Sequence, residues 1–277
     1  MRWILTLLCA AALVGADEKK DPPAKPAKGD TGLTGVLTEK AFKALHELTE
    51  EKRPPLKGKA VKVGAMTAYL SLPKGAGPHP GVVVIHEWWG LNVHVKHWAD
   101  RLAADGYAAL AIDLYGGNVA KTRDDAMKYM RTVEKDKAVK QLLAAHAFLK
   151  SDARIRAKKR AVIGWCFGGG FSLQLALHAK DLDAAIIYYG RLQTDPETLG
   201  AIKAEVLGIF GTRDRGIPPR TVKAFADGLT AAKVKHTIHS YAAPHAFANP
   251  SSARYDQKAA TAAWAEVRKF LARKLKG

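Results

Sequence analysis

Short apolar runs alternate with longer amphipathic segments along most of this 277-residue chain, and this alternation restricts the fold more than any other feature. A short, continuous apolar run is typical of a strand buried on both faces, and an amphipathic segment is typical of a helix. Strands that alternate with helices form a mostly parallel sheet with helices on both faces. The sequence therefore predicts an α/β fold of this kind.

The expected elements can be placed along the chain. We expect strands at residues 61–72 (around Gly64), 82–85, 107–114, 161–164, 184–189, 206–210 and 234–241. We expect helices at residues 92–104, 137–150, 168–179, 218–232 and 256–274, with a short helical segment near Leu199. A further helix at residues 38–53, capped by Thr38, is expected to pack on the outside of the domain. In such sheets, catalytic residues gather in loops beyond the carboxyl ends of the strands.

The first residues have the pattern of an export signal. A positively charged start precedes an apolar run at residues 3–14, and the small residues Gly15 and Ala16 follow it. A helix that spans a bilayer requires about 20 apolar residues, so this run is too short. We expect a signal peptide at residues 1–16, rather than a lipid anchor on Cys9 or an uncleaved membrane helix. The mature protein is then periplasmic or secreted, with no stable membrane insertion.

The mature chain is expected to contain one linker and one domain. Residues 17–31 are rich in proline, lysine and alanine, which is typical of a flexible tether. Residues 32–277 carry the whole strand and helix pattern, a length common for a single α/β domain. The net charge is +18, but the basic residues are scattered along helices without a recognition motif. We expect a solvated basic surface, no nucleic-acid partner, and a monomer.

The junction between a predicted strand and the next helix, residues 164–169, reads GWCFGG. This is the nucleophile-elbow pattern with a cysteine in place of the serine. Such a turn is so tight that side chains at positions 164 and 168 would collide with backbone, and the nucleophile itself is strained. The following helix offers N–H groups and its positive dipole end to developing negative charge. We therefore predict that Cys166 is a nucleophile; the alternative is an inert cysteine in a nucleotide-binding turn.

Two residues further along the chain can complete a triad with Cys166. A thiol needs a base and the base needs an orienting acid, and elbow hydrolases place them in the order nucleophile, acid, histidine. Asp214 follows the predicted strand at residues 206–210, and His245 follows the last strand. Simpler roles remain open, since Asp214 can cap a helix or pair with a neighbouring arginine, and His245 can be a surface loop residue.

Acyl transfer also requires hydrogen-bond donors for the oxyanion. We expect these to be the backbone N–H groups of Phe167, directly after the nucleophile, and of Trp88, in the loop after an early strand. Aromatic residues near these loops, Trp89, Tyr115 and Trp165, predict an aromatic-walled substrate pocket, although a core position is the plainer interpretation for some of them.

Two histidines raise the question of a metal site. His94 and His97 stand one turn apart on the predicted helix at residues 92–104. No third ligand with metal-binding spacing accompanies them, and histidines are common on helix surfaces. We therefore expect neither a metal nor an organic cofactor.

Five segments together resemble the dienelactone hydrolase family. In order, they are HEWWGLN at residues 86–92, DLY at 113–115, GWCFGG at 164–169, DRGIP at 214–218 and HAF at 245–247. The resemblance, which covers residues 61–275, implies an α/β-hydrolase fold with a Cys166, Asp214 and His245 triad. It also implies that Glu87 lies beside the thiol and keeps the resting cysteine protonated until substrate displaces it. The plainer alternative is that Glu87 anchors its loop.

The chain departs from the family pattern at two positions. Dienelactone-cleaving members hold the substrate carboxylate with arginines after the DLY segment and after the histidine loop. Here residues 116–118 are Gly-Gly-Asn, and Asn249 stands in the histidine loop. The nearest cations, none at a matching position, are Lys121, Arg123, Arg191, Arg213 and Arg215. The resemblance therefore does not extend to carboxylate recognition.

The prediction as a whole is an exported hydrolase that cleaves a small carboxylic ester or lactone. His245 accepts the proton of Cys166 as the sulfur attacks the carbonyl, and water then hydrolyses the thioester. One alternative is a catalytically silent hydrolase-fold binding protein of the cell envelope. Another is peroxide reduction by the lone cysteine, although the mature chain has no resolving thiol.

Overall fold

The computed structural model describes residues 38–47 and 52–277. The predicted signal peptide and linker lie outside these described residues. The described segments belong to one compact unit, residues 31–277. None of the helices described is both long enough and apolar enough to span a membrane.

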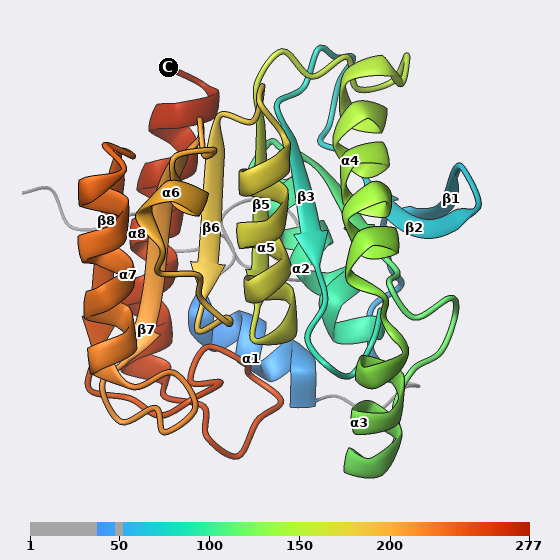
Figure 1. The fold of residues 1–277 in the computed structure, drawn as a ribbon. Helices are drawn as coiled ribbons and strands as arrows, with labels where there is room; N and C mark the ends of the chain where they lie inside the picture. Colours follow the sequence, from blue (N-terminus) through green and yellow to red (C-terminus); the bar gives the residue numbers. More distant parts are fainter. Residues whose placement is uncertain (1–37, 48–51) are drawn as a thin grey trace, which may run out of the picture. The chain divides into compact units, whose positions relative to one another are not determined.

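One sheet of eight strands organises the unit, in the order β1-β2-β4-β3-β5-β6-β7-β8 (Figure 1). The strands are β1 (Lys59–Val63), β2 (Met66–Ser71), β3 (Gly81–Ile85), β4 (Ala108–Ile112), β5 (Arg160–Trp165), β6 (Ala184–Tyr188), β7 (Glu205–Gly211) and β8 (His236–Tyr241). Strand β2 pairs antiparallel with both β1 and β4. The six strands β4, β3, β5, β6, β7 and β8 all run parallel to one another. Every residue of β3 to β7 is buried, because helices cover both faces.

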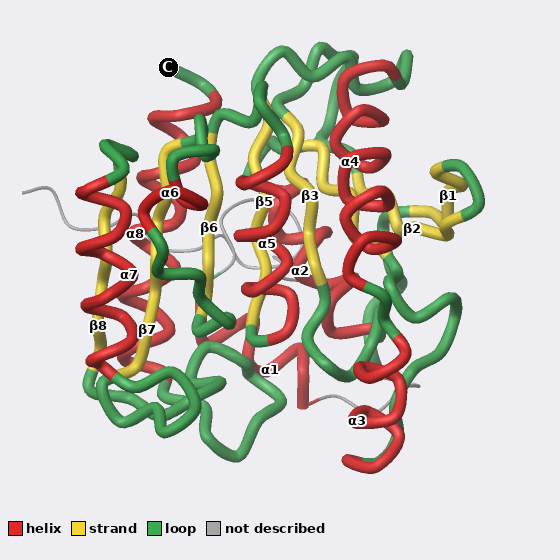
Figure 2. The backbone as a smooth tube through the Cα atoms, viewed as in Figure 1, coloured by secondary structure: helices red, strands yellow, loops and turns green. Residues whose placement is uncertain are grey.

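Figure 2 shows the helices in front of and behind the sheet. Those in front are α4 (Lys135–Ser151), α5 (Phe167–His178), α6 (Pro196–Leu199) and α7 (Pro219–Ala231). Those behind are α2 (Val93–Ala104) and α8 (Gln257–Leu275), and α1 (Glu39–Glu47) packs against α8. This arrangement confirms the predicted α/β fold.

One helix, α3 (Arg123–Thr132), was not predicted. It begins at a capping box, in which the Thr122 side chain accepts from the Asp125 N–H and the Asp125 carboxylate accepts from the Thr122 N–H. Only Ala126 is buried along its length. The helix has no wide apolar stripe, so hydrophobic periodicity could not reveal it; the threonine and aspartate three residues apart were the available signal.

Buried charge and aromatic rings fix α1 to α2. The Arg101 guanidinium of α2 donates to the Glu39 carboxylate of α1 at 3.0 Å, and both side chains are almost fully buried. The same guanidinium lies 4.4 Å from the ring of Phe42 and 4.3 Å from that of Trp264. These contacts stack the cation between aromatic faces and orient the N-terminal helix over α2 and α8.

The turn between β5 and α5 packs backbone directly against backbone. A Cβ atom at Gly164 would lie 2.3 Å from the carbonyl oxygen of Gly168, and one at Gly168 would lie 2.4 Å from that of Ile85. Both distances are far below van der Waals contact. The glycines predicted at this turn are therefore a steric requirement, and their close approach determines where Cys166 lies.

We predict that Gly164→Ala lowers the free energy of unfolding by about 3 kcal/mol, because the added methyl group must push two backbone segments apart. Gly170→Ala, in the first turn of α5, is the matched control, since its Cβ would meet nothing closer than 3.4 Å. The control should change stability by less than about 1 kcal/mol. Urea unfolding measures both; equal effects of the two substitutions would refute the steric explanation.

Candidate active site

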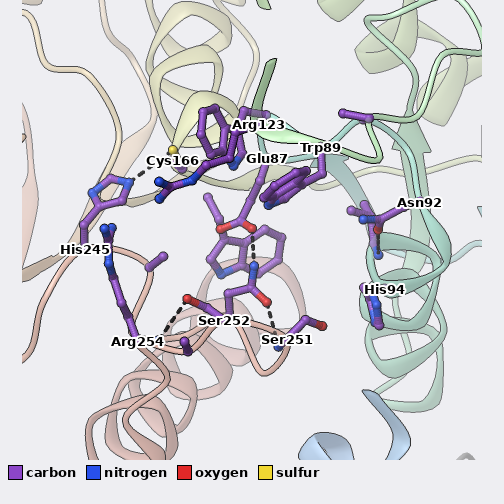
Figure 3. Close-up of a pocket in the computed structure, with 18 of the residues that line it drawn as sticks. Glu87, Trp89, Asn92, His94, Arg123, Cys166, His245, Ser251, Ser252 and Arg254 are labelled. Atoms are coloured by element: carbon purple, nitrogen blue, oxygen red, sulfur yellow. Dashed lines mark hydrogen bonds between the residues drawn. The ribbon is translucent and has the colours of Figure 1, made fainter. Parts of the chain in front are cut away.

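Four loops at the carboxyl end of the parallel strands bring the predicted chemical groups together. Glu87 follows β3, Cys166 stands between β5 and α5, Asp214 follows β7, and His245 follows β8. Parallel strands end at the same edge of a sheet, so residues more than 150 positions apart in sequence meet there. Figure 3 shows Cys166, Glu87 and His245 around one pocket.

Cys166 has the strained backbone expected of a nucleophile at an elbow. Its φ is 53° and its ψ is −113°, outside the regions favoured by residues with a side chain. Its N–H donates to the carbonyl oxygen of Tyr188 at 3.0 Å, which ties the strained residue to β6. The side chain is half-buried and lines the pocket. The strain therefore directs the sulfur out of the sheet toward the space that a ligand can enter.

Cys166, His245 and Asp214 form a continuous hydrogen-bonded chain. Nε2 of His245 lies 3.1 Å from the Cys166 sulfur, and Nδ1 lies 2.7 Å from Oδ2 of Asp214. The other carboxylate oxygen of Asp214 accepts the backbone N–H groups of Gly216 and Ile217, at 2.8 and 3.0 Å. Asp214 is therefore held by its own loop with one oxygen directed at the imidazole, and it neither caps a helix nor pairs with a neighbouring arginine.

The charges of these three residues shift the pKa values of His245 and Asp214. Burial alone would lower the pKa of His245, but hydrogen bonds to Asp214 and Cys166, with the negative charge on these partners, raise it to about 10. Burial acts to raise the pKa of Asp214, and the bonds from His245 and the loop N–H groups outweigh it and lower that pKa. The raised pKa favours the protonated imidazole, in which Nδ1–H donates to the Asp214 carboxylate and Nε2–H to the Cys166 sulfur.

Glu87 lines the same pocket, but its hydrogen bond goes to Asn249. The Asn249 side-chain amide donates to Oε2 of Glu87, and its own oxygen accepts the N–H of Ser251 at 2.9 Å. Oε1 of Glu87 is buried with no hydrogen-bond partner in the described part of the chain. Burial raises the pKa of Glu87 to about 7, against the opposing effects of the His245 charge and the Asn249 bond. From the sequence, Asn249 stood out only as a departure from the family pattern, and no local pattern predicted its contact with Glu87.

The two expected oxyanion donors come from the loop that contains Cys166 and from a loop that lines the same pocket. Phe167 is the first residue of α5, so its N–H has no partner within the helix. Trp88 lines the pocket from the loop after β3.

The pocket has a volume of about 630 Å³, and its wall contains both aromatic and charged side chains. Trp89 and Trp165 line it, together with Trp88 and Trp98. Tyr115, which we expected in this wall, is instead buried behind it. Its ring lies 5.5 Å from that of Phe167 and 4.6 Å from that of His86. The wall is therefore indole-rich, and Tyr115 supports the elbow from beneath.

Three cations also line the pocket: Lys121, Arg123 and Arg254. In Figure 3 the guanidinium groups of Arg123 and Arg254 extend toward Cys166 and His245. Arg213 and Arg215, also considered from the sequence, line a separate depression beside Asp214. Nothing in the sequence pointed to Arg254, because the loop between β8 and α8 has no regular pattern and only its folding brings the residue back to the pocket.

His97 differs from its expected surface position. It is 1% exposed, and His94 lies at the edge of the pocket (Figure 3). A third histidine, His46 of α1, joins them with ligand atoms within 4.8 Å of one another. Sequence spacing could not reveal this cluster, because His46 lies on a separate helix.

Comparisons with known proteins agree with this geometry. The family profile of the dienelactone hydrolase family matches residues 66–275. A protein of Saccharolobus solfataricus, provisionally named carboxymethylenebutenolidase, is 32% identical over 247 residues, which cover 74% of this chain and 93% of the relative.

Solved structures show the same relationship. A provisionally named dienelactone hydrolase from Klebsiella pneumoniae superposes with a TM-score of 0.72 at 27% identity, covering 78% of this chain and 98% of that one. A dienelactone hydrolase-like promiscuous phosphotriesterase from metagenomic libraries superposes with a TM-score of 0.71 at 28% identity, covering 78% and 97%. The resemblance predicted from the five motifs is confirmed. The chain is an α/β-fold hydrolase that belongs to the dienelactone hydrolase family.

Proposed function

We propose that this protein hydrolyses a small carboxylic ester or lactone through a thioester on Cys166. The observation that carries the proposal is the hydrogen-bonded chain from the Cys166 sulfur through His245 to Asp214. A thiolate paired with an imidazolium is a nucleophile that needs no metal to attack a carbonyl carbon. One relative is provisionally named carboxymethylenebutenolidase, a name that denotes an enzyme that cleaves a lactone. This name supports the same substrate class.

The first half-reaction forms the acyl-enzyme. The thiolate of Cys166 attacks the carbonyl carbon, and the carbonyl electron pair moves to oxygen, where the N–H groups of Phe167 and Trp88 stabilise the oxyanion. The intermediate collapses, the bond to the leaving oxygen breaks, and that oxygen takes the proton from Nε2 of His245. Asp214 holds the imidazole in place throughout. The products are a thioester and an alcohol, which remain one molecule when the substrate is a lactone.

The second half-reaction returns the enzyme to its resting state. Neutral His245 accepts a proton from water as the water oxygen attacks the thioester carbonyl. The second tetrahedral intermediate expels the thiolate of Cys166, which again pairs with the imidazolium. The released carboxylic acid ionises in solution, so protons and electrons balance without a cofactor.

The pocket wall also favours a negatively charged substrate. Arg123, Arg254 and Lys121 line the cavity that contains the sulfur, and no carboxylate of the described chain forms an ion pair with any of them. A carboxylate on the substrate would complement these cations. They do not occupy the positions, after the DLY segment and after the histidine loop, at which dienelactone-cleaving family members have arginines. We propose that the best substrates carry an acidic group.

Cys166→Ala should reduce kcat/KM for a short aryl ester by at least about 10³-fold, because no other thiol in the described chain can form the thioester. Mass spectrometry of the wild type with a slow ester should show one acyl group on Cys166, and the variant should show none. Turnover that survives in Cys166→Ala would contradict the mechanism. Wild-type protein that binds lactones and esters without cleaving any of them would instead support the silent binding protein.

Glu87→Gln should make stability less dependent on pH. The folded-state pKa of about 7 exceeds the ordinary value of 4.5, so this proton stabilises the folded state at low pH, and the contribution is lost as pH rises through 7. Between about pH 5 and 8 the free energy of unfolding of the wild type should fall by about 2–3 kcal/mol, and that of the variant should not. Urea unfolding at both pH values measures this, with the exposed Glu134→Gln as the control. Parallel pH profiles for wild type and Glu87→Gln would refute the shift.

Arg123→Gln and Arg254→Gln should each raise KM for an ester that carries a carboxylate by roughly three- to tenfold, since exposed charge pairs contribute modestly. KM for the neutral ester of the same size should change less than about twofold. Arg191→Gln, an exposed arginine outside the pocket lining, is the matched control. Equal effects on charged and neutral esters would show that the two arginines do not recognise an anion.

A further inference from the structure

Three histidine side chains from two helices meet beside the active-site pocket. His46 stands in the last turn of α1, and His94 and His97 stand near the start of α2. Their candidate ligand atoms all lie within 4.8 Å of one another. The ring of His46 lies 4.6 Å from that of His94 and 5.5 Å from that of His97, centre to centre. No residue of the proposed hydrolytic mechanism belongs to this cluster.

The ring nitrogens of this cluster lack the partners that buried polar atoms normally have. His97 is 1% exposed, and neither of its ring nitrogens has a hydrogen-bond partner among residues 38–47 and 52–277. His46 is 6% exposed; its Nδ1–H donates to the Phe42 carbonyl oxygen at 2.8 Å, and its Nε2, near the backbone of His94, has no hydrogen bond of normal geometry in the same ranges. Buried polar atoms are nearly always hydrogen-bonded, so these nitrogens indicate a ligand.

One hydrogen bond decides which ring nitrogen of His46 can bind a metal. The bond from His46 Nδ1–H to a backbone carbonyl selects Nε2 as the ligand atom, as a second-shell partner does in metal sites.

We propose that His46, His94 and His97 bind one Zn²⁺ ion, which joins α1 to α2. Three imidazole ligands suit Zn²⁺, and a site with three protein ligands leaves a fourth position for water or another small ligand. His94 also lines the pocket, at the side opposite His245 in Figure 3, so one of the three ligands borders the cavity that contains Cys166. The proposal does not depend on the proposed hydrolysis.

The site must contract slightly on binding. Zn–N bonds of about 2.0–2.1 Å in a tetrahedron place the nitrogens about 3.3 Å apart. Side-chain rotation of the histidines, with a small movement of α1, must therefore bring the most distant pair closer by about 1.5 Å. The nearby charges oppose one another: Arg53 disfavours a cation at His94 and His97, and Asp100 favours one at His97.

Isothermal titration of the full chain, purified without a histidine tag and treated with a chelator, tests the proposal with Zn²⁺ alone. We expect one site per chain with a Kd below about 10 µM, and a higher melting temperature with the metal bound. His46→Gln and His97→Gln should each weaken binding by at least about 100-fold and abolish the melting shift. The exposed His178→Ala is the matched control and should bind as the wild type does.

A spectroscopic measurement keeps the test valid if a variant fails to fold. Co²⁺ added to the wild-type chain should produce the intense visible absorption of a four-coordinate ion, and Zn²⁺ should displace it. Absence of a one-to-one site, a six-coordinate spectrum, or binding unchanged in both folded glutamine variants would each overturn the proposal. The last result would assign the metal to surface histidines.

Discussion

The contact between backbone atoms at the elbow is the constraint on which the site depends. Gly164 and Gly168 let β5 and α5 approach so closely that the intervening Cys166 has only a strained conformation available. The burial of β3 to β7 on both faces of the sheet resists the relief of that strain. Packing energy of the core thus maintains one unfavourable φ angle, and that angle exposes the sulfur at the start of a helix.

The electrostatics of the site follow from this placement. A sulfur at the N-terminus of α5 lies beside His245, whose imidazole is in turn held by the fully buried Asp214. Glu87 is a second buried carboxyl group in the same pocket, and Asn249 supplies its single hydrogen bond from a described residue. The two carboxyl groups have opposite pKa shifts because one has several donors and the other is mainly desolvated.

Helix α1 contacts both the buried Arg101 of α2 and His94 in the wall of the pocket. Glu39 and Phe42 fix α1 on Arg101, and His46 brings the end of the same helix against His94 in the pocket wall. A change in the position of α1 would therefore be transmitted to one side of the pocket. The proposed zinc site lies on this side of the pocket, opposite His245, whereas the guanidinium groups of Arg123 and Arg254 extend toward the triad.

The sequence by itself determined the parallel sheet, the elbow and the order of Cys166, Asp214 and His245, because strand burial and glycine sterics act over a few residues and leave local patterns. Helix α3 was missed because it buries almost nothing, and Tyr115 was misplaced because an aromatic residue near a site loop can face either the pocket or the core. Only the tertiary structure brought Asn249 to Glu87, Arg254 to the pocket and His46 to His97. Such contacts depend on how loops and helices that are distant in sequence pack together, and no short-range periodicity in the sequence encodes that packing.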